Sequence, residues 1–165
     1  MKRNLAKVDE FAMIECYGNS YDEEACKYIA EIIEKRATDE LWYVDFSNMF
    51  VTRAETLPRS LNILIKSIDS KPIQELYLHD NAFGPIGVAQ FEDFIKSANH
   101  LQKLSVTNCG LGPEATTTIA NALMENEHTK LNTLCISRSR VETKGAIALA
   151  NYFNSYDSLE RLEIF

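Results

Sequence analysis

The chain has 165 residues, of which 45% are hydrophobic, and this is the composition of a globular protein rather than a disordered one. It carries 24 Asp and Glu residues against 17 Lys and Arg residues, which gives a formal net charge of −7. That acidic balance argues against nucleic acid and against anionic membranes as partners, because both attract basic patches. The sequence also contains no apolar run of about 20 residues that could span a membrane.

A short apolar pattern recurs along the chain and is clearest from Ile73, where it reads I-x-x-L-x-L-x-x-N-x-F. The ninth position of this frame falls on Asn19, Met49, Asn81, Cys109 and Ser139, at intervals of 30, 32, 28 and 30 residues. A period of this length predicts leucine-rich repeats of the long class, with one strand and one helix in each repeat.

In chain order, strands are predicted within the frames at 11–21, 41–51, 73–83, 101–111 and 131–141. Each frame is followed by an apolar stripe with helical spacing, at 25–33, 57–68, 91–95, 119–123 and 147–153. Pro58, Pro85 and Pro113 mark helix starts. We therefore predict an α/β solenoid, a horseshoe segment with parallel strands on its concave face and helices on its convex face.

The expected organisation is a single domain over 1–165, with about five complete repeats, a candidate N-terminal cap at 1–10 and the start of a sixth repeat. The sixth frame begins with Leu159, Leu162 and Ile164, and it would leave an exposed strand edge. Because terminal repeats need covering, we expect either a truncated chain or incomplete gene model, or a partner chain that caps the stack.

The frame also predicts which residues face the concave side. They are the residue between the two Leu positions and the two that follow the second Leu: Glu15, Tyr17, Gly18, Asp45, Ser47, Asn48, Tyr77, His79, Asp80, Ser105, Thr107, Asn108, Cys135, Ser137 and Arg138. Such a polar surface of mixed charge is typical of a protein-binding face rather than of an apolar small-molecule cavity. No phosphate-loop, dinucleotide, metalloprotease or nucleophile-elbow motif is present, and the four cysteines lack zinc-site spacing.

Three segments stand in a characteristic order. The first reads DFSNMF from Asp45 with Arg53 and Leu57-Pro58 behind it, the second reads DNAFGP from Asp80, and the third reads NCGLGP from Asn108. In order and spacing they resemble the Ran GTPase-activating protein family, whose repeats are ribonuclease-inhibitor-like, and the stretch RSRVE from Arg138 is similar too. By composition alone, Asn108 would be an ordinary turn residue and Arg53 a solvated loop residue.

The resemblance implies an activator of a partner GTPase that performs no chemistry of its own. Asn108 matches the residue held to place the GTPase's own glutamine, which orients the attacking water, and Arg53 matches a loop arginine important for activation. Asn48 and Asp80 hold the equivalent turn positions of earlier repeats, and Tyr77, His79 and Arg138 share their face, so these five are the predicted partner-binding residues.

The implied partner is a Ran-type small GTPase that acts in nucleocytoplasmic transport. GTP and magnesium would belong to that partner, so no cofactor of the chain's own is implied. The implied location is the cytoplasm, with the nuclear envelope as a further expected site.

Two departures from the family keep alternatives open. Glu55 stands where the family has a lysine, and the family has about twice as many repeats and an acidic tail. The chain could instead bind Ran without activating it, or serve as a non-catalytic interaction scaffold comparable to the leucine-rich domain of tropomodulin-like proteins.

Overall fold

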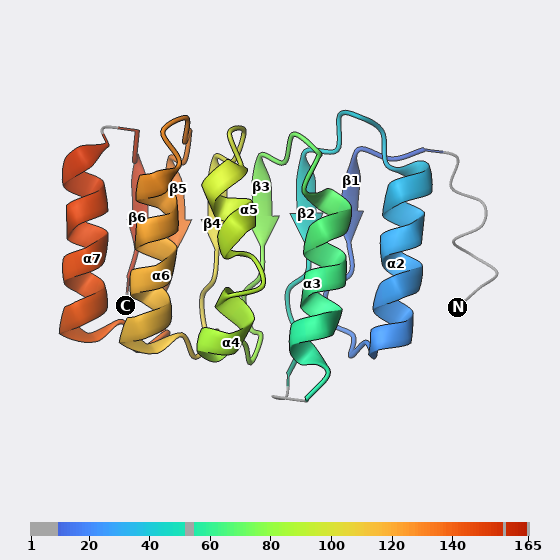
Figure 1. Ribbon diagram of the computed structural model, residues 1–165, viewed down its shortest axis with the longest axis horizontal. Coiled ribbons are helices and arrows are strands. Elements are labelled where there is room, and N and C mark those ends of the chain that lie inside the picture. Colours follow the sequence, from blue (N-terminus) through green and yellow to red (C-terminus); the bar gives the residue numbers. More distant parts are fainter. Residues whose placement is uncertain (1–9, 52–54, 157, 165) are drawn as a thin grey trace.

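The computed structural model describes residues 10–51, 55–156 and 158–164. Strands and helices alternate in the order β1 (Met13–Glu15), α2 (Glu23–Arg36), β2 (Tyr43–Asp45), α3 (Leu57–Ile68), β3 (Glu75–Tyr77), α4 (Gly84–Val88), α5 (Glu92–Ser97), β4 (Lys103–Ser105), α6 (Gly112–Glu125), β5 (Thr133–Cys135), α7 (Glu142–Ser155) and β6 (Arg161–Glu163). The helices form one layer over one face of the sheet (Figure 1). The predicted fold class, an α/β leucine-rich repeat solenoid, is confirmed.

All neighbouring strands are parallel, and their order in the sheet is their order in the chain. The central residue of each strand from β2 to β5 is aligned with the next, and Val44, Leu76, Leu104 and Leu134 are each fully buried. Because side chains alternate along a strand, the residues on either side of these four point away from the helices. That open face of the sheet is the predicted concave surface.

The helix boundaries follow local signals. Asp22 caps α2, where its side chain accepts a hydrogen bond from the backbone N–H of Ala25 at 2.8 Å. The three predicted proline starts are confirmed, since α3, α4 and α6 each carry a proline in their first turn. The stripe predicted on α3 is confirmed as well, because all its apolar members are buried: Leu57, Leu61, Leu64, Ile65 and Ile68.

The third repeat carries two short helices, α4 and α5, where a single helix was expected, although the apolar residues predicted for it are all buried: Phe91, Phe94 and Ile95. The chain approaches itself closely at this point, since a Cβ added to Gly87 would lie 2.5 Å from the Cβ of Phe83. A glycine here permits the contact but is a poor residue for a continuous helix. At the end of the second frame the expected buried residue was also wrong: Val51 is 54% exposed, and Phe50 is buried instead.

The stripe predicted on α7 was wrong by part of a turn. Gly145, Ala148, Leu149 and Tyr152 are buried, whereas Ile147 is 57% exposed and Ala150 is exposed. The cause is that α7 packs on α6 along one side only. In the repeat before, Ala120 has the position equivalent to Ala150 and is fully buried, because α7 covers α6.

The structure describes most of the C-terminal end of the stack but little of the predicted N-terminal cap. The cap predicted at 1–10 lies outside the described residues except for Glu10. At the other end the sixth frame does form a strand, on which Leu162 is 39% exposed, and Ile164 just after it is 43% exposed. Among the described helices, none combines the length and apolar character that crossing a membrane requires.

Candidate functional site

Four polar residues occupy the same place in successive repeats, in the turn just after the strand. They are Asn48, Asp80, Asn108 and Arg138, and we call them the rim. Each has a positive φ, between 51° and 57°, a left-handed conformation that Asn and Asp tolerate better than most residues. The shared turn gives the rim a regular spacing, with one residue after each of the four strands β2 to β5.

The rim turns are held in place by the backbone of the next repeat. The N–H of Asn48 donates to the carbonyl of His79 at 3.0 Å, and the N–H of Asp80 donates to the carbonyl of Thr107 at 2.9 Å. The N–H of Asn108 donates to the carbonyl of Ser137 at 2.8 Å. The backbones of Asn48, Asp80 and Asn108 are therefore fixed by the next repeat, and their side chains are left for other contacts.

A buried asparagine lies beneath the rim and joins the second and third repeats. The Oδ1 of Asn81 accepts from the backbone N–H groups of Met49 and Phe50 at 2.9 and 2.8 Å. Its Nδ2 donates to the carbonyls of Phe46 and Leu78 at 2.9 and 2.8 Å. With all four bonds made and only 2% of Asn81 exposed, this side chain is a fixed part of the turn that carries Asn48.

The next two repeats have smaller groups at the position of Asn81. The Sγ of Cys109 donates to the carbonyl of Leu78 at 3.1 Å, and the Oγ of Ser139 donates to the carbonyl of Val106 at 3.1 Å. Burial raises the pKa of the Cys109 thiol to about 12, so it stays protonated and remains a donor at neutral pH.

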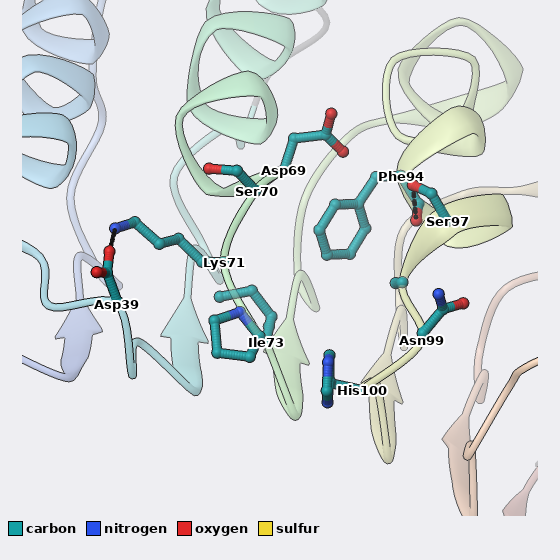
Figure 2. A pocket seen from close by; sticks show the side chains of 11 residues that line it. Asp39, Asp69, Ser70, Lys71, Ile73, Phe94, Ser97, Asn99 and His100 are labelled. Carbon is teal, nitrogen blue, oxygen red and sulfur yellow. Dashed lines mark hydrogen bonds and ion pairs between the residues drawn. The ribbon is translucent and has the colours of Figure 1, made fainter.

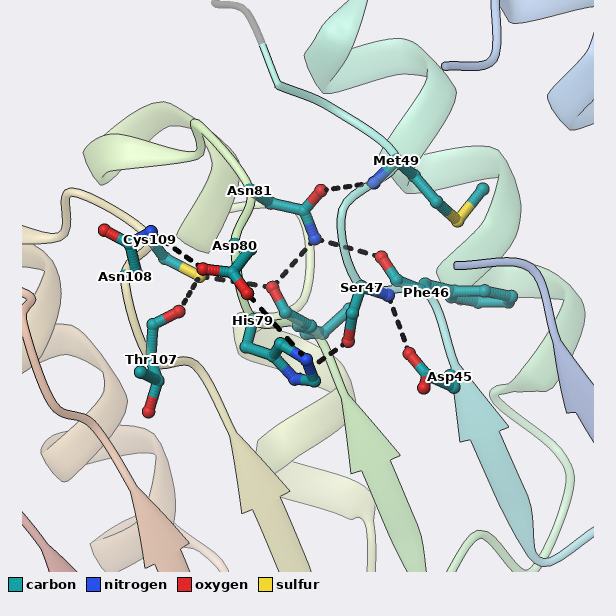
Figure 3. A network of polar contacts seen from close by, with 11 residues as sticks. Asp45, Phe46, Ser47, Met49, His79, Asp80, Asn81, Thr107, Asn108 and Cys109 are labelled. Atoms are coloured by element: carbon teal, nitrogen blue, oxygen red, sulfur yellow. Dashed lines mark hydrogen bonds and ion pairs between the residues drawn. The ribbon is translucent and has the colours of Figure 1, made fainter. Parts of the chain in front are cut away.

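Side chains of three adjacent repeats form a polar network on the rim (Figure 3). The Nδ2 of Asn108 donates to Oδ1 of Asp80 at 2.7 Å, and Oδ2 of Asp80 lies 4.0 Å from Nε2 of His79. On its other side the His79 ring meets the Oγ of Ser47, with 2.9 Å between Nδ1 and Oγ. Because the Asn108 amide donates to Asp80, its nitrogen points along the rim toward Asp80 and its oxygen points away from Asp80.

The same network contains a serine, a histidine and an aspartate, but their arrangement is not that of a hydrolase triad. Ser47 is only 1% exposed, so its hydroxyl cannot reach a substrate carbonyl. The 4.0 Å separation of His79 and Asp80 is also too long for the hydrogen bond that would orient the ring. Sequence spacing did not predict this grouping, because Ser47 lies one repeat before His79 and Asp80.

The open face of the sheet carries an aromatic and ionic cluster in front of the rim. The rings of Tyr43 and Tyr77 lie 5.3 Å apart between centroids, and the Nζ of Lys103 lies 4.8 Å from the Tyr77 centroid. The Tyr77 hydroxyl donates to Glu75 at 2.6 Å, and burial together with this bond raises the pKa of Tyr77 above its usual range. The sequence analysis missed Tyr43, Glu75 and Lys103, although strand alternation from the buried leucines would have placed them here.

Tyr77, His79, Asp80 and Arg138 line one surface depression, and Asn108 is joined to it by its bond to Asp80. Asn48 lies in the equivalent turn one repeat before Asp80. Arg53 lies outside the described residues, and Glu55 is exposed. Several residues expected to be exposed on the concave face are instead buried, at 8% exposure or less: Asp45, Ser47, Ser105, Cys135 and Ser137. They are buried because the side chains of neighbouring strands, about 4.8 Å apart, crowd one another on this face.

The cysteines show no sign of reactive or metal-binding chemistry. All four are free, and burial raises the pKa of Cys135, the one beside the open face, to about 11. A neutral thiol is a poor nucleophile and a poor metal ligand. Within residues 10–51, 55–156 and 158–164, no three His, Cys, Asp or Glu side chains are grouped so as to hold a metal ion.

A pocket of about 420 Å³ lies at the opposite edge of the sheet, where helices lead back into strands (Figure 2). Lys71 pairs there with Asp39 at 3.2 Å, close to Ile73, Phe94 and His100. This pocket is lined by different residues from the rim and shares none of its side chains.

These features define the class of the protein: a leucine-rich repeat solenoid with a polar rim at the carboxyl ends of its strands. Two solved structures share the fold at 17% sequence identity. The C-terminal domain of tropomodulin from Caenorhabditis elegans has a TM-score of 0.58 and matches 92% of this chain and 92% of its own. The actin-binding site 2 structure of leiomodin-1 has a TM-score of 0.60 and matches 93% and 87%. No protein-family model matches the sequence.

Sequence comparison is more specific. Ran GTPase-activating protein 1 of Xenopus laevis is 33% identical over 98% of this chain, and the protein of the same name from Saccharomyces cerevisiae is 29% identical over 88%. Ran GTPase-activating protein of Drosophila melanogaster is 30% identical over 88%. The predicted resemblance is confirmed: the chain is similar to Ran GTPase-activating proteins over most of its length. It spans 26 to 39% of the length of these three relatives.

Proposed function

We propose that this chain stimulates GTP hydrolysis by a Ran-type small GTPase, with Asn108 as the residue that acts on the reaction. The names of the sequence relatives support the partner class. The observation that carries the role of Asn108 is its bond to Asp80, which fixes the exposed amide by its nitrogen at 2.7 Å and leaves the oxygen to accept from a partner.

The chemistry follows from what phosphoryl transfer needs. The transferred group requires positioning and charge stabilisation more than covalent help, and a glutamine of the GTPase orients the attacking water. A fixed amide oxygen can accept a hydrogen bond from the side-chain N–H of that glutamine and so restrict its rotation. Holding a reacting group in position in this way lowers the entropic part of the barrier.

In this proposal GTP and magnesium are supplied by the GTPase, and the chain contributes no cofactor. Arg53 is proposed to assist as well, as its match to the family's loop arginine implies. Tyr77, His79, Asp80 and Arg138 are proposed to contact the partner because they line one surface that is joined to Asn108 through Asp80. Asn48 is proposed to contact it from the equivalent turn of the second repeat.

The test is single-turnover hydrolysis of GTP by Ran, with and without the chain, for the wild type and two variants. Asn108→Ala should reduce the stimulated rate by roughly 100-fold or more, the scale seen when one positioned polar group is lost. Asn108→Gly should do the same without backbone strain, because glycine accepts the φ of 56° at this position. Asn121→Ala, at an exposed site on the helix α6, is the matched control and should retain full activity.

Unchanged rates in both Asn108 variants would remove this residue from the mechanism. Tight binding of GTP-loaded Ran without any acceleration would instead favour the alternative of a non-catalytic binding surface. Glu55, which stands where the family has a lysine, would then be the first residue to replace. If Ran neither binds nor hydrolyses faster in the presence of the folded chain, the interaction-scaffold alternative with a different partner is the better account.

A further inference from the structure

The rim contains a pocket that the proposed role of Asn108 leaves unexplained. It has a volume of about 440 Å³ and lies between the turns of the fourth and fifth repeats. Its lining consists of Asn108, Gly110, Gly112, Pro113, Arg138, Arg140 and Glu142. Asn108 is thus shared between the Asp80 contact on one side and this pocket on the other.

The two arginines of the pocket have no anionic partner within the part of the chain that the structure describes. Six other basic side chains there do pair with carboxylates, among them Lys96 with Glu92 at 2.8 Å and Lys144 with Glu114 at 3.6 Å. The chain has more acidic than basic residues, with a net charge of −7. Two exposed arginines left unpaired at one place on such a surface are available to an anion from outside the chain.

The backbone of this turn supports the same interpretation. Arg140 and Glu142 have φ values of 53°, in the left-handed region. The equivalent residues one repeat earlier, 30 positions back, are Gly110 and Gly112, which adopt φ values of 60° and 71° without a Cβ penalty. The fifth repeat therefore keeps two charged side chains at positions where glycine fits more easily, and strain of this kind is typical of functional sites.

The charges of the pocket select among anions. Two guanidinium groups and the Glu142 carboxylate sum to one positive charge, which matches a carboxylate better than a phosphate dianion that Glu142 would repel. Guanidinium groups also bind carboxylates through two parallel hydrogen bonds, and the rim is open to an approaching protein surface. We propose that this pocket binds the carboxylate of an acidic side chain on a protein partner.

Within the proposed function, on which this second role rests, the bound carboxylate would belong to the GTPase. Arg138 and Arg140 would then fix the partner's orientation beside Asn108 without contacting the reacting atoms. Their loss should weaken the binding of GTP-loaded Ran about tenfold, a typical effect of removing charge-paired interface arginines. The maximal hydrolysis rate at saturation should change much less than the affinity, because neither arginine contacts the reacting atoms.

The first experiment tests the pocket without any GTPase. The folded chain is titrated with a tetraglutamate peptide, with a tetraglutamine peptide, both amidated at the C-terminus, and with inorganic phosphate, while the side-chain Nε–H signals of the arginines are followed by NMR. Tetraglutamate alone should shift the Arg138 and Arg140 signals, and the double variant Arg138→Gln/Arg140→Gln should lose this binding. Arg59→Gln, at an exposed arginine on α3, is the matched control and should bind as the wild type does.

A further variant separates binding from a structural role. Arg140→Gly removes the side chain and the left-handed strain together, so peptide binding should fall while the unfolding temperature is not lowered. A clear fall in unfolding temperature would show that Arg140 serves the fold and would overturn the proposal. Binding of phosphate in preference to tetraglutamate, binding that survives in the double variant, or no binding at all would overturn it too.

The second experiment measures the affinity and the maximal rate of the same variants with GTP-loaded Ran. If Ran is not stimulated by the wild-type chain, the proposed function fails while the peptide titration still decides the nature of the pocket. If Ran is stimulated and the double variant binds it as well as the wild type, the pocket has no part in the partner interface and the proposal is wrong.

Discussion

Removal of the Asn81 side chain is the most direct test of how the rim is supported. In Asn81→Ala, the backbone N–H groups of Met49 and Phe50 lose their acceptor, and the carbonyls of Phe46 and Leu78 lose a donor. The site is 2% exposed, so water cannot replace these bonds without local opening. The variant therefore isolates the energetic contribution of one buried amide that joins two repeats.

The expected loss can be added up from these groups. A buried donor left without a partner costs about 1–3 kcal/mol, which applies to two N–H groups here. The carbonyls contribute less, because a carbonyl with an empty lone pair is better tolerated and that of Leu78 still accepts from Cys109. We expect a total of about 3–5 kcal/mol, a large part of the stability of about 5–15 kcal/mol of an ordinary domain.

The assay is urea and thermal unfolding followed by circular dichroism, where this loss corresponds to a fall of roughly 6–20 °C in the unfolding temperature. Asn19→Ala is the matched control, because Asn19 holds the same frame position but is exposed, and its contacts are local: a bond of 3.2 Å to the carbonyl of Tyr17 and a bond with the side chain of Tyr21. Its change should stay within about 0.5 kcal/mol. Equal losses in the two variants would refute the reasoning, since burial and the four bonds are what distinguish them.

Two further predictions concern packing and alkaline pH. Gly145→Ala should destabilise the chain by about 1–3 kcal/mol despite the better helix propensity of alanine, because the new Cβ would lie 2.9 Å from Thr116 of α6. The urea midpoint should fall, and Thr116→Ser should recover part of the loss; a stabilised variant would mean that the helices move apart freely. Burial raises the pKa of Cys16 and Cys109 from 9.0 to about 12, so the unfolded chain loses these protons first and the free energy of unfolding should fall between pH 9 and pH 12. Denaturation across that range is the measurement, and Cys109→Ser should show a shallower pH dependence, whereas an unchanged slope would contradict the assigned cause.

Sequence alone predicted the features that the repeat imposes on every unit. The positions of the strands, the buried leucine column and the turn at Asn108 follow from periodicity, because each unit must bury the same face against its neighbours. The prolines that mark the starts of α3, α4 and α6 are local signals, and they predicted these helix starts equally well. These features do not depend on which particular side chains meet across the repeats.

The rest depends on contacts between repeats that no periodicity encodes. The bond from Asn108 to Asp80 joins residues 28 positions apart, and its formation depends on side-chain length and on the twist of two turns. Ile147 looks like a core residue in the helical pattern but is exposed, because burial on α7 depends on what packs beside it. Phe50 likewise displaced Val51 from the core, since the larger ring fills the space next to Phe83.

The order of the sheet has a consequence for how such a chain can change in length. Each strand pairs only with the strands of the adjacent repeats, so a whole repeat can be inserted or removed at a junction while the remaining ladder is preserved. Between β3 and β4, however, an inserted unit would move Asp80 and Asn108 apart by one further strand spacing, about 4.8 Å, and break their 2.7 Å bond. An insertion between β4 and β5 would leave that bond intact. The fold therefore tolerates a change in repeat number at every junction. The orientation of Asn108, however, is preserved only when the change falls outside the junction between β3 and β4.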